Sequence, residues 1–207
     1  MRKRRPAKAR DINEDVAAAK RPARLLDPDK ARARTLQRAG KLLAAKPRSV
    51  AELRERLLEK AWTNEEVVDA ALAKLEEYGY VNDQSFALGF ASYRVRQKPV
   101  GRQRLARDLQ LKQISRETAD KALDKVYEET PEEDLITRAI EKRARLRGLP
   151  QTRQETKSLY DYLLRLGFPY DLIIRKVREA SAAEINEDET QADENEALID
   201  ETDADAG

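Results

Sequence analysis

The chain has 207 residues, with no cysteine, no histidine and a single methionine. Disulfides, the usual zinc ligands, a thiol nucleophile and an imidazole base are therefore excluded. Charged residues make up 39% and aromatic residues 5%, against about 25% charged in an average globular domain. A chain with so many charged and so few aromatic residues has a large surface for its core, which favours an elongated helical array over a compact sphere. With neither a signal-peptide core nor a membrane-spanning run, we expect a cytoplasmic protein.

The chain begins with a basic segment, residues 1–29, which mixes Arg, Lys, Ala and Pro without a sustained apolar period. We predict that this arm is disordered. Residues 30–180 follow a helical pattern throughout, and no segment alternates apolar and polar residues like a strand. This region is predicted to be one helical domain.

Helix boundaries within this domain have clear sequence signals. Four pairs fit a capping box, in which a hydroxyl and a carboxylate satisfy free backbone N–H groups at a helix start. They are Ser49 with Glu52, Thr63 with Glu66, Thr130 with Glu133 and Thr152 with Glu155. Pro131 is expected at the first position of its helix. Gly79 and Gly148, the latter followed by Pro150, are expected to end helices.

A threefold repeat emerges when the chain is aligned with itself. Its anchors are Trp62, Ile114 and Phe168, each predicted to lie in a tight turn between two helices. Apolar residues recur in all three copies at nine and five residues before and after the anchor: Leu53, Leu105 and Leu159; Leu57, Leu109 and Leu163; Val67, Ala119 and Ile173; Ala71, Leu123 and Val177.

A further amphipathic helix precedes each pair. Its apolar residues are Leu36, Ala39 and Leu43 in the first copy, Phe86, Phe90 and Tyr93 in the second, and Leu135, Ala139 and Ile140 in the third. The fold class is therefore all-α, with three tandem three-helix, helix-turn-helix-like repeats in an elongated curved array. We place the repeats at about 31–80, 82–128 and 130–180.

The sequence contains no recognisable catalytic constellation. The seven glycines form no phosphate-binding loop. No serine stands in a Ser-Lys motif, and the abundant carboxylates fall mostly on polar helix faces or at helix starts. We therefore expect no cofactor, no metal and no enzymatic activity.

A basic stretch in the middle repeat is the candidate interaction site. No Asp or Glu occurs between Asp83 and Asp108, so this region is expected to carry unneutralised positive potential. An ordinary solvated helix face is the open alternative. The candidate partner-binding or DNA-binding residues are Arg94, Arg96, Lys98, Arg102, Arg104, Arg107 and Lys112.

Four tyrosines could suggest stacking on nucleic-acid bases. They are Tyr78, Tyr80, Tyr160 and Tyr162. Their positions near helix ends and on apolar faces favour packing in the core or at its rim instead.

Three segments resemble the RecX family of recombinase regulators: RSVAELRERLLEKAW, LEEYGYVNDQSFALGFASYRV and VGRQRLARDLQLKQIS. The resemblance runs through about 31–180 and is most specific in the first two repeats. Ala61 and Gln113 stand where the family often has Gly after the turn lysines Lys60 and Lys112. A different turn geometry is expected there.

The resemblance implies a protein that binds the RecA filament on single-stranded DNA and modulates it, usually by inhibition, in DNA repair, recombination and the SOS response. We expect a monomer that binds single-stranded DNA only weakly and non-specifically and does not bind membranes. The alternative is a helix-turn-helix protein that reads DNA directly. Acidic residues at the starts of the helices that would read DNA disfavour it, because they repel phosphate. A passive helical scaffold for another protein also remains open.

The chain ends in an acidic tail. Residues 181–207 hold eleven Asp and Glu and no Lys or Arg, while residues 1–180 carry a formal charge of +13. We predict that this tail is disordered and competes with nucleic acid for the basic side chains of the body.

Overall fold

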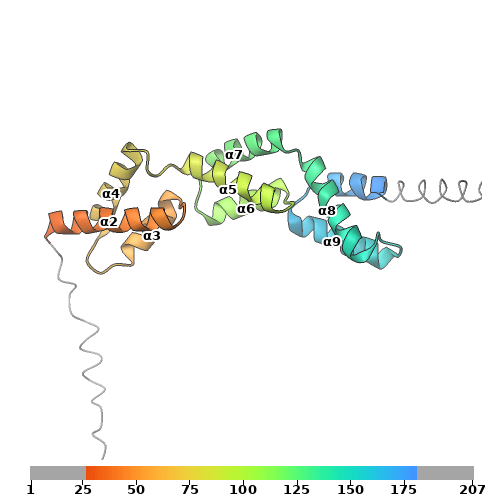
Figure 1. Ribbon diagram of the computed structural model, residues 1–207, viewed down its shortest axis with the longest axis horizontal. Coiled ribbons are helices and arrows are strands. Elements are labelled where there is room, and N and C mark those ends of the chain that lie inside the picture. The colour runs from red at the N-terminus through yellow and green to blue at the C-terminus, as the bar shows by residue number, and fades with distance from the viewer. Residues whose placement is uncertain (1–26, 181–207) are drawn as a thin grey trace, which may run out of the picture. The chain divides into compact units, whose positions relative to one another are not determined.

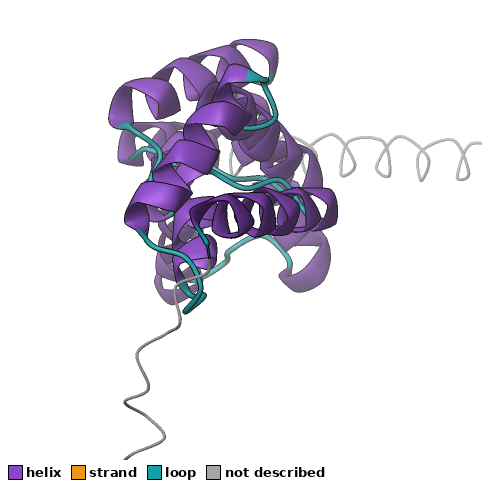
Figure 2. Ribbon diagram, turned by 90° about the vertical axis from the view of Figure 1, so that its left-hand side faces the viewer, coloured by secondary structure: helices purple, strands orange, loops and turns teal. Residues whose placement is uncertain are grey.

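The computed structural model describes residues 27–180, which contain only helices and the turns between them (Figures 1 and 2). In chain order these are α2 (Pro28–Ala45), α3 (Val50–Leu58), α4 (Glu65–Glu77), α5 (Asp83–Gln97), α6 (Arg102–Leu111), α7 (Arg116–Glu129), α8 (Glu132–Arg147) and α9 (Arg153–Leu166). A further helix covers residues 170–180. The all-α repeat fold is thus confirmed. The predicted tail, and all of the predicted arm except its last three residues, lie outside the described residues.

The first helix begins inside the predicted arm. Asp27 caps α2 by accepting a hydrogen bond from the N–H of Asp29, and Pro28 occupies the first helical position. Proline suits that position because its fixed φ is helical and its missing N–H has no partner there in any helix. The Asp27-Pro28 pair is thus a helix start, and the arm was predicted about two residues too long.

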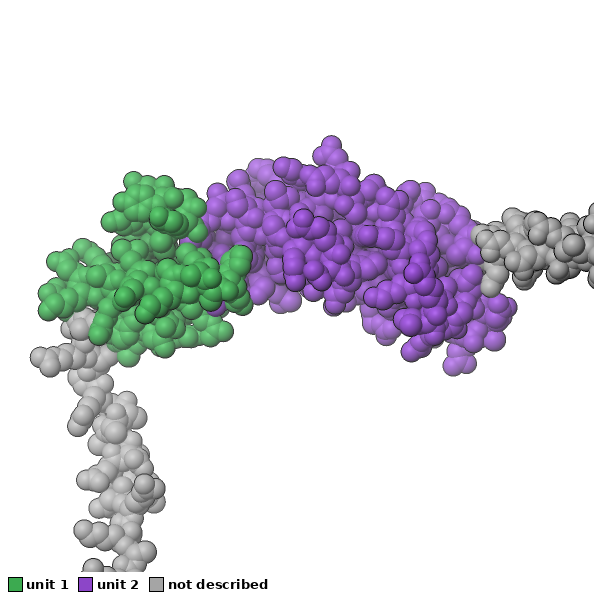
Figure 3. Space-filling model, viewed as in Figure 1, with its two compact units in different colours: residues 1–47, 53–80 green, residues 48–52, 81–207 purple. Residues whose placement is uncertain are grey.

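The chain divides into two compact units (Figure 3). Unit 1 comprises Met1–Pro47 and Leu53–Tyr80, and unit 2 comprises Arg48–Glu52 and Val81–Gly207. In unit 1, α2 packs against α4. Thr35 is fully buried there, and its hydroxyl donates to the carbonyl of Ala31 at 2.8 Å. That bond satisfies a polar group that would otherwise destabilise the small core.

The repeat predicted from the sequence coincides with the buried residues. All four apolar columns around the anchors are buried in all three copies, and so are the anchors Ile114 and Phe168. The exception is Trp62, which is only half-buried, with the Arg34 guanidinium 6.0 Å from its ring centroid. The three copies therefore use the same positions to build their cores.

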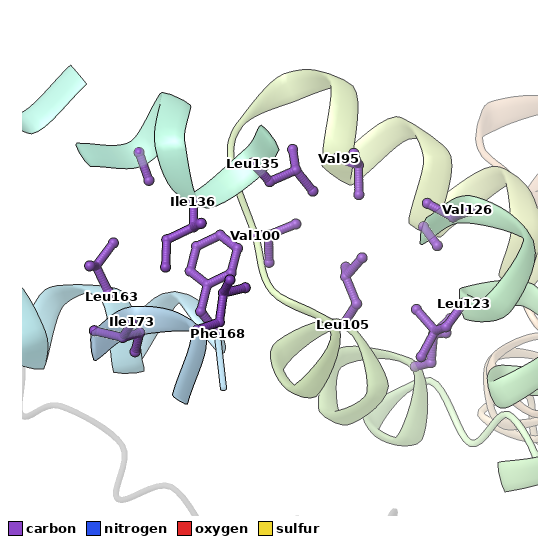
Figure 4. Packing of buried hydrophobic residues seen from close by; sticks show 14 of the residues in the cluster. Val95, Val100, Leu105, Leu123, Val126, Leu135, Ile136, Leu163, Phe168 and Ile173 are labelled. Carbon is purple, nitrogen blue, oxygen red and sulfur yellow. The ribbon is translucent and has the colours of Figure 1, made fainter. Parts of the chain in front are cut away.

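The second and third repeats share one continuous core within unit 2. Figure 4 shows Phe168, which is fully buried, beside Ile136 of α8 and Val100 of the α5–α6 turn. A buried aromatic side chain contributes a large apolar area. The turn of the third repeat therefore helps to hold the α5–α6 turn of the second.

The apolar face predicted for α5 was wrong. Tyr93 is 57% exposed and Phe86 and Phe90 are only partly buried, stacked on each other with centroids 6.0 Å apart. The buried stripe is Ala87, Ala91 and Val95, at the four-residue spacing of one helix face. Small side chains on this stripe suit close packing against α7, which the bulkier aromatic residues would prevent.

A complete capping box, that of Thr152 and Glu155, is present at the start of α9. Asn64, not Thr63, caps α4, and Pro131 is the N-cap of α8 rather than its first helical residue. Ser49 does accept a bond from the N–H of Glu52. The carboxylate of Glu52 also pairs with a lysine distant in sequence.

Ala61 and Gln113, the two residues that stand where the family often has Gly, differ in backbone conformation. Gln113 has φ of 57°, the same left-handed region as its counterpart Gly167, with φ of 90°. In both turns the anchor's N–H closes the helix by bonding a carbonyl five residues earlier, Leu109 and Leu163 respectively. Ala61 does not have positive φ. The expected departure in geometry therefore occurs in the first repeat only, while Gln113 adopts a conformation that favours glycine.

Candidate interaction surface of the middle repeat

The seven basic candidates all lie in unit 2, in one continuous stretch of the chain. Arg94 and Arg96 are in the last turn of α5, and Lys98 is its C-cap. The other four follow from α6 and its C-cap: Arg102, Arg104, Arg107 and Lys112. The end of α5 and the helix α6, joined by the Pro99–Gly101 turn, thus carry the whole set.

Three of these cations are neutralised, contrary to the expectation of unneutralised potential. Arg94 pairs with Asp108 at 3.0 Å, and both side chains are about three-quarters buried. Arg102 pairs with Asp124 of α7 at 2.7 Å. Lys112 pairs with Glu52 of α3 at 2.6 Å. Asp108 is the residue that ends the acid-free stretch, whereas Asp124 and Glu52 come from other helices, so the gap in acidic residues along the sequence is not a gap in space.

Among residues 27–180, the remaining four candidates have no acidic partner that compensates their charge. Arg104 donates to the backbone carbonyl of Arg165 at 2.8 Å, and Arg107 donates to that of Gln103 at 3.2 Å. A carbonyl accepts a hydrogen bond without cancelling the positive charge. The side chains of Arg96 and Lys98 are exposed and form no ion pair within residues 27–180. These four side chains define the basic surface of the middle repeat.

Beside Arg107 lies a groove between α6 and α7 that the sequence reading missed. Its volume is about 450 Å³. Arg107 and Gln110 line it from α6, and Arg116 and Asp120 line it from α7, over apolar side chains that include Ile114. Arg116 is 96% exposed. The sequence signal for this groove was the helix-turn-helix register itself, which places the end of the second helix beside the start of the third.

The arginine-bearing helix α6 is fixed at its start by the third repeat. The N–H of Gly101 donates to the carbonyl of Leu166 at 2.8 Å. A Cβ added at Gly101 would stand 2.2 Å from the carbonyl oxygen of Gly167, and one added at Gly167 would stand 2.5 Å from Arg104. Only two glycines allow the backbones to approach so closely.

A carboxylate from α8 completes this junction. Glu132, the first residue of α8, accepts a hydrogen bond from the N–H of Arg102 at 2.6 Å and so caps α6, which lacks a cap of its own. Burial raises the pKa of Glu132, opposed by that backbone bond. Nearby, the Tyr127 hydroxyl donates to the carbonyl of Val100 at 2.9 Å. Burial raises the pKa of this hydroxyl.

The first turn of α3, residues 48–52, is held in the same way within unit 2. Ser49 stands at the position equivalent to Gly101, and its hydroxyl donates to the carbonyl of Lys112 at 2.8 Å. Asp83, the first residue of α5, accepts from the N–H of Val50 at 2.9 Å and caps α3. In both junctions, the second helix of one repeat is thus capped by the first residue of the first helix of the next repeat.

The predicted packing of the tyrosines holds for only two of them. Tyr160 and Tyr162 pack partly buried against the core of unit 2. Tyr78 and Tyr80 are instead 61% and 70% exposed, with their rings edge to face at 6.4 Å. The glycine between them has φ of 71°, which turns the chain sharply and leaves both side chains outside the core.

Within residues 27–180 there is no group of three or more acidic side chains arranged to hold a metal ion. Among the same residues, no helix is both long enough and apolar enough to cross a membrane. The described site thus offers exposed cations, a groove and hydrogen-bonding side chains. These features define an all-helical repeat protein with an exposed basic surface.

Comparisons with known proteins specify that class. Residues 36–75 match the model of the first three-helix domain of RecX, and residues 82–123 match that of the second. A regulatory protein RecX from Streptomyces coelicolor is 33% identical over 157 residues, which cover 74% of this chain and 81% of the relative. Another from Chlorobaculum tepidum is 31% identical over 144 residues, covering 69% and 86%. The chain belongs to the RecX family of regulatory proteins.

Solved structures share the fold. A crystal structure of RecX from Lactobacillus salivarius superimposes with a TM-score of 0.66 at 20% identity, covering 74% of this chain and 99% of that one. A second RecX crystal structure gives 0.64, covering 82% and 78%. The repeat architecture is thus common to proteins whose sequences have diverged widely.

Proposed function

We propose that this protein regulates the RecA recombinase by binding its filament on single-stranded DNA, in DNA repair and recombination. Family membership supports the regulatory role. The observation that carries the binding surface is the set of uncompensated cations in the middle repeat, Arg96, Lys98, Arg104 and Arg107, beside the α6–α7 groove. An anionic partner, whether acidic protein surface or phosphate backbone, complements such a surface.

The protein is proposed to act by binding alone, leaving catalysis to the recombinase. Direct reading of DNA by a helix-turn-helix element is less well supported. The first turn of α4 carries Glu65 and Glu66, and that of α7 carries Glu117, held near Lys121. These carboxylates stabilise the helix starts but repel the phosphates that a reading helix approaches.

The test measures RecA ATP hydrolysis and filament length on single-stranded DNA as the full-length chain is added. The variant Arg96→Glu/Lys98→Glu/Arg107→Glu reverses three exposed charges. Its half-maximal effect should need at least about tenfold more protein, the equivalent of about 1.4 kcal/mol of binding. Arg102 is left intact because its pair with Asp124 also supports the fold.

The matched control is Lys125→Glu/Arg138→Glu/Arg178→Glu, which reverses three exposed charges elsewhere in unit 2. It should modulate the recombinase like the wild type. If both triple variants act at wild-type concentrations, the middle-repeat cations are only a solvated face. The direction of the change in ATP hydrolysis separates inhibition from stabilisation. The chain alone should hydrolyse neither ATP nor DNA.

A further inference from the structure

A second basic cluster lies in the third repeat, at the end of α8. The segment from Lys142 to Arg147 contains four cations and no acidic residue, and Glu141 precedes it. The C-terminal end of a helix carries partial negative charge, which accounts for part of this preference. It does not account for Leu146, which is 76% exposed among the arginines. The cluster is therefore both cationic and apolar.

This cluster borders a groove between α8 and α9 of about 240 Å³. Its apolar lining includes Ile140, Leu149, Pro150 and Leu159. The volume is below the roughly 300–1,000 Å³ of typical small-molecule sites. It suits one or two aliphatic side chains of a peptide better than a metabolite.

The polar rim of the groove is built for a negatively charged partner. The Nη2 of Arg143 donates to the Ser158 hydroxyl at 2.8 Å, and its guanidinium lies 4.8 Å from the centroid of the Tyr162 ring. Both contacts orient this cation without neutralising it. The side chain of Arg147 has no ion-pair partner within residues 27–180. A carboxylate entering the groove would thus meet two available guanidinium groups.

One carboxylate, that of Glu155, also lines the groove. It accepts hydrogen bonds from the N–H groups of Gln151 and Thr152 at 2.9 and 3.0 Å. These bonds keep its pKa below the ordinary value. Because Glu155 is engaged at the start of α9, both arginines remain free to bind another anion.

We propose that residues 193–203 of this same chain dock in the α8–α9 groove. Their sequence, DENEALIDETD, places six acidic residues around Leu198 and Ile199. The aliphatic pair matches the apolar lining, and the flanking carboxylates match Arg143 and Arg147. Elsewhere in residues 181–207, Ile185 is the only other large aliphatic residue. The segment is thus the one part of the tail in which two adjacent large aliphatic residues stand between acidic residues.

The length of chain permits this contact. The segment begins about a dozen residues after Ala180, a distance the extended chain can span over about 40 Å. The longest helix of the third repeat, α8 with 16 residues, is only about 24 Å long. Docking would cover the cationic end of α8 and withhold it from other anions, with a large local concentration because both partners share a chain.

The test uses the full-length protein, which has no cysteine, so that Thr202→Cys provides a single site for a nitroxide spin label. Amide signals of residues 140–159 should lose most of their intensity through proximity to the label. The loss should disappear in Leu198→Ser/Ile199→Ser and persist in the matched variant Ile185→Ser. If Leu198→Ser/Ile199→Ser leaves the broadening unchanged, or if the broadening falls instead on α5 and α6, the proposal is wrong.

The groove side is tested by Arg143→Glu/Arg147→Glu in the same labelled chain. This variant should abolish the broadening, whereas Lys125→Glu/Arg138→Glu should retain it. A mixture of ¹⁵N-labelled chain without nitroxide and unlabelled chain with nitroxide should show no broadening. Broadening in that mixture would instead assign the contact to a second copy and overturn docking within one chain.

Discussion

The two capping junctions of unit 2 occupy equivalent positions but use different chemistry. At the first, a serine hydroxyl and the Glu52–Lys112 ion pair connect the start of α3 to the end of α6. At the second, the backbones of Gly101 and Gly167 meet directly, without side chains between them. Neighbouring copies of the repeat therefore make contact at equivalent positions. The strength of each contact, and its tolerance of substitution, depend on the residues present there.

The largest expected effect comes from filling the glycine contact. In Gly167→Ala, the new Cβ would overlap the backbone of Arg104 and the residue would remain at positive φ. Destabilisation should be about 3 kcal/mol or more. Gly89→Ala is the matched control, because a Cβ there meets nothing within 4 Å in a helix interior. Urea unfolding should show it unchanged or slightly stabilised, and equal effects of both variants would remove the distinction between the junctions.

A smaller effect is expected at the equivalent position of the first junction. Ser49→Ala removes a buried hydroxyl that donates to the Lys112 carbonyl and accepts from the Glu52 N–H. The cost should be about 1–2 kcal/mol in chemical denaturation. Thr152→Ala, at an exposed cap in α9, provides the comparison and should cost less because water replaces the lost bond. A loss at Ser49 as large as that at Gly167 would contradict the proposed difference in tolerance.

The carboxylate cap of α6 should respond to pH. Because burial raises the pKa of Glu132, the folded state holds its proton more tightly than the unfolded state. This group therefore contributes more stability below its unfolded pKa, and that contribution is lost as pH rises through the folded pKa. At neutral pH, Glu132→Ala should cost about 1 kcal/mol by removing the cap.

The matched variant Glu132→Gln keeps an acceptor for the Arg102 N–H without the buried charge. It should be at least as stable as the wild type at neutral pH, and it should flatten the pH dependence of thermal unfolding between the two pKa values. A Gln variant as unstable as the Ala variant would show that the charge, not the hydrogen bond, caps α6.

The smallest effect concerns the turns at the ends of the two junction helices. Gln113→Gly relieves a left-handed conformation and should stabilise the protein by about 0.5 kcal/mol, after allowance for the greater freedom of glycine in the unfolded chain. Ala61→Gly is the control, because Ala61 lacks positive φ and should gain nothing. Thermal unfolding of both variants would reveal whether the two turns differ as described.

Features of the fold that depend on local pattern were predictable from the sequence. Leu53, Leu105 and Leu159 are buried because each stands four residues before another leucine of the repeat, so that both leucines lie on one face of their helix. The face of α5 was not predictable from hydrophobicity, because close helix packing favoured Ala87 and Ala91 over Phe86 and Phe90.

Prediction of the candidate site from the sequence was limited in the same way, because it could not account for packing between helices. The acid-free stretch between Asp83 and Asp108 correctly marked a basic segment, yet Arg102 is neutralised by Asp124 of another helix. Pairing across helices depends on the three-dimensional packing, which spacing along one helix does not reveal. The groove beside Arg107 and the oriented guanidinium of Arg143 required the same information.

The residues that cap α3 and α6 come later in the sequence than the helices they cap, so these helices are synthesised before their caps. When α3 has been synthesised, its capping residue Asp83 has not yet been added to the chain. In the same way, α6 is synthesised before Glu132 and before Leu166, whose carbonyl binds the N–H of Gly101. Among the second helices of the three repeats, α9 instead carries a capping box of its own, formed by Thr152 and Glu155. Domains made on the ribosome generally begin to fold from the end that emerges first. Here the earlier repeats would remain incompletely capped until the later ones emerge, so a ribosome stalled before residue 132 would hold a nascent chain whose α6 lacks its carboxylate cap.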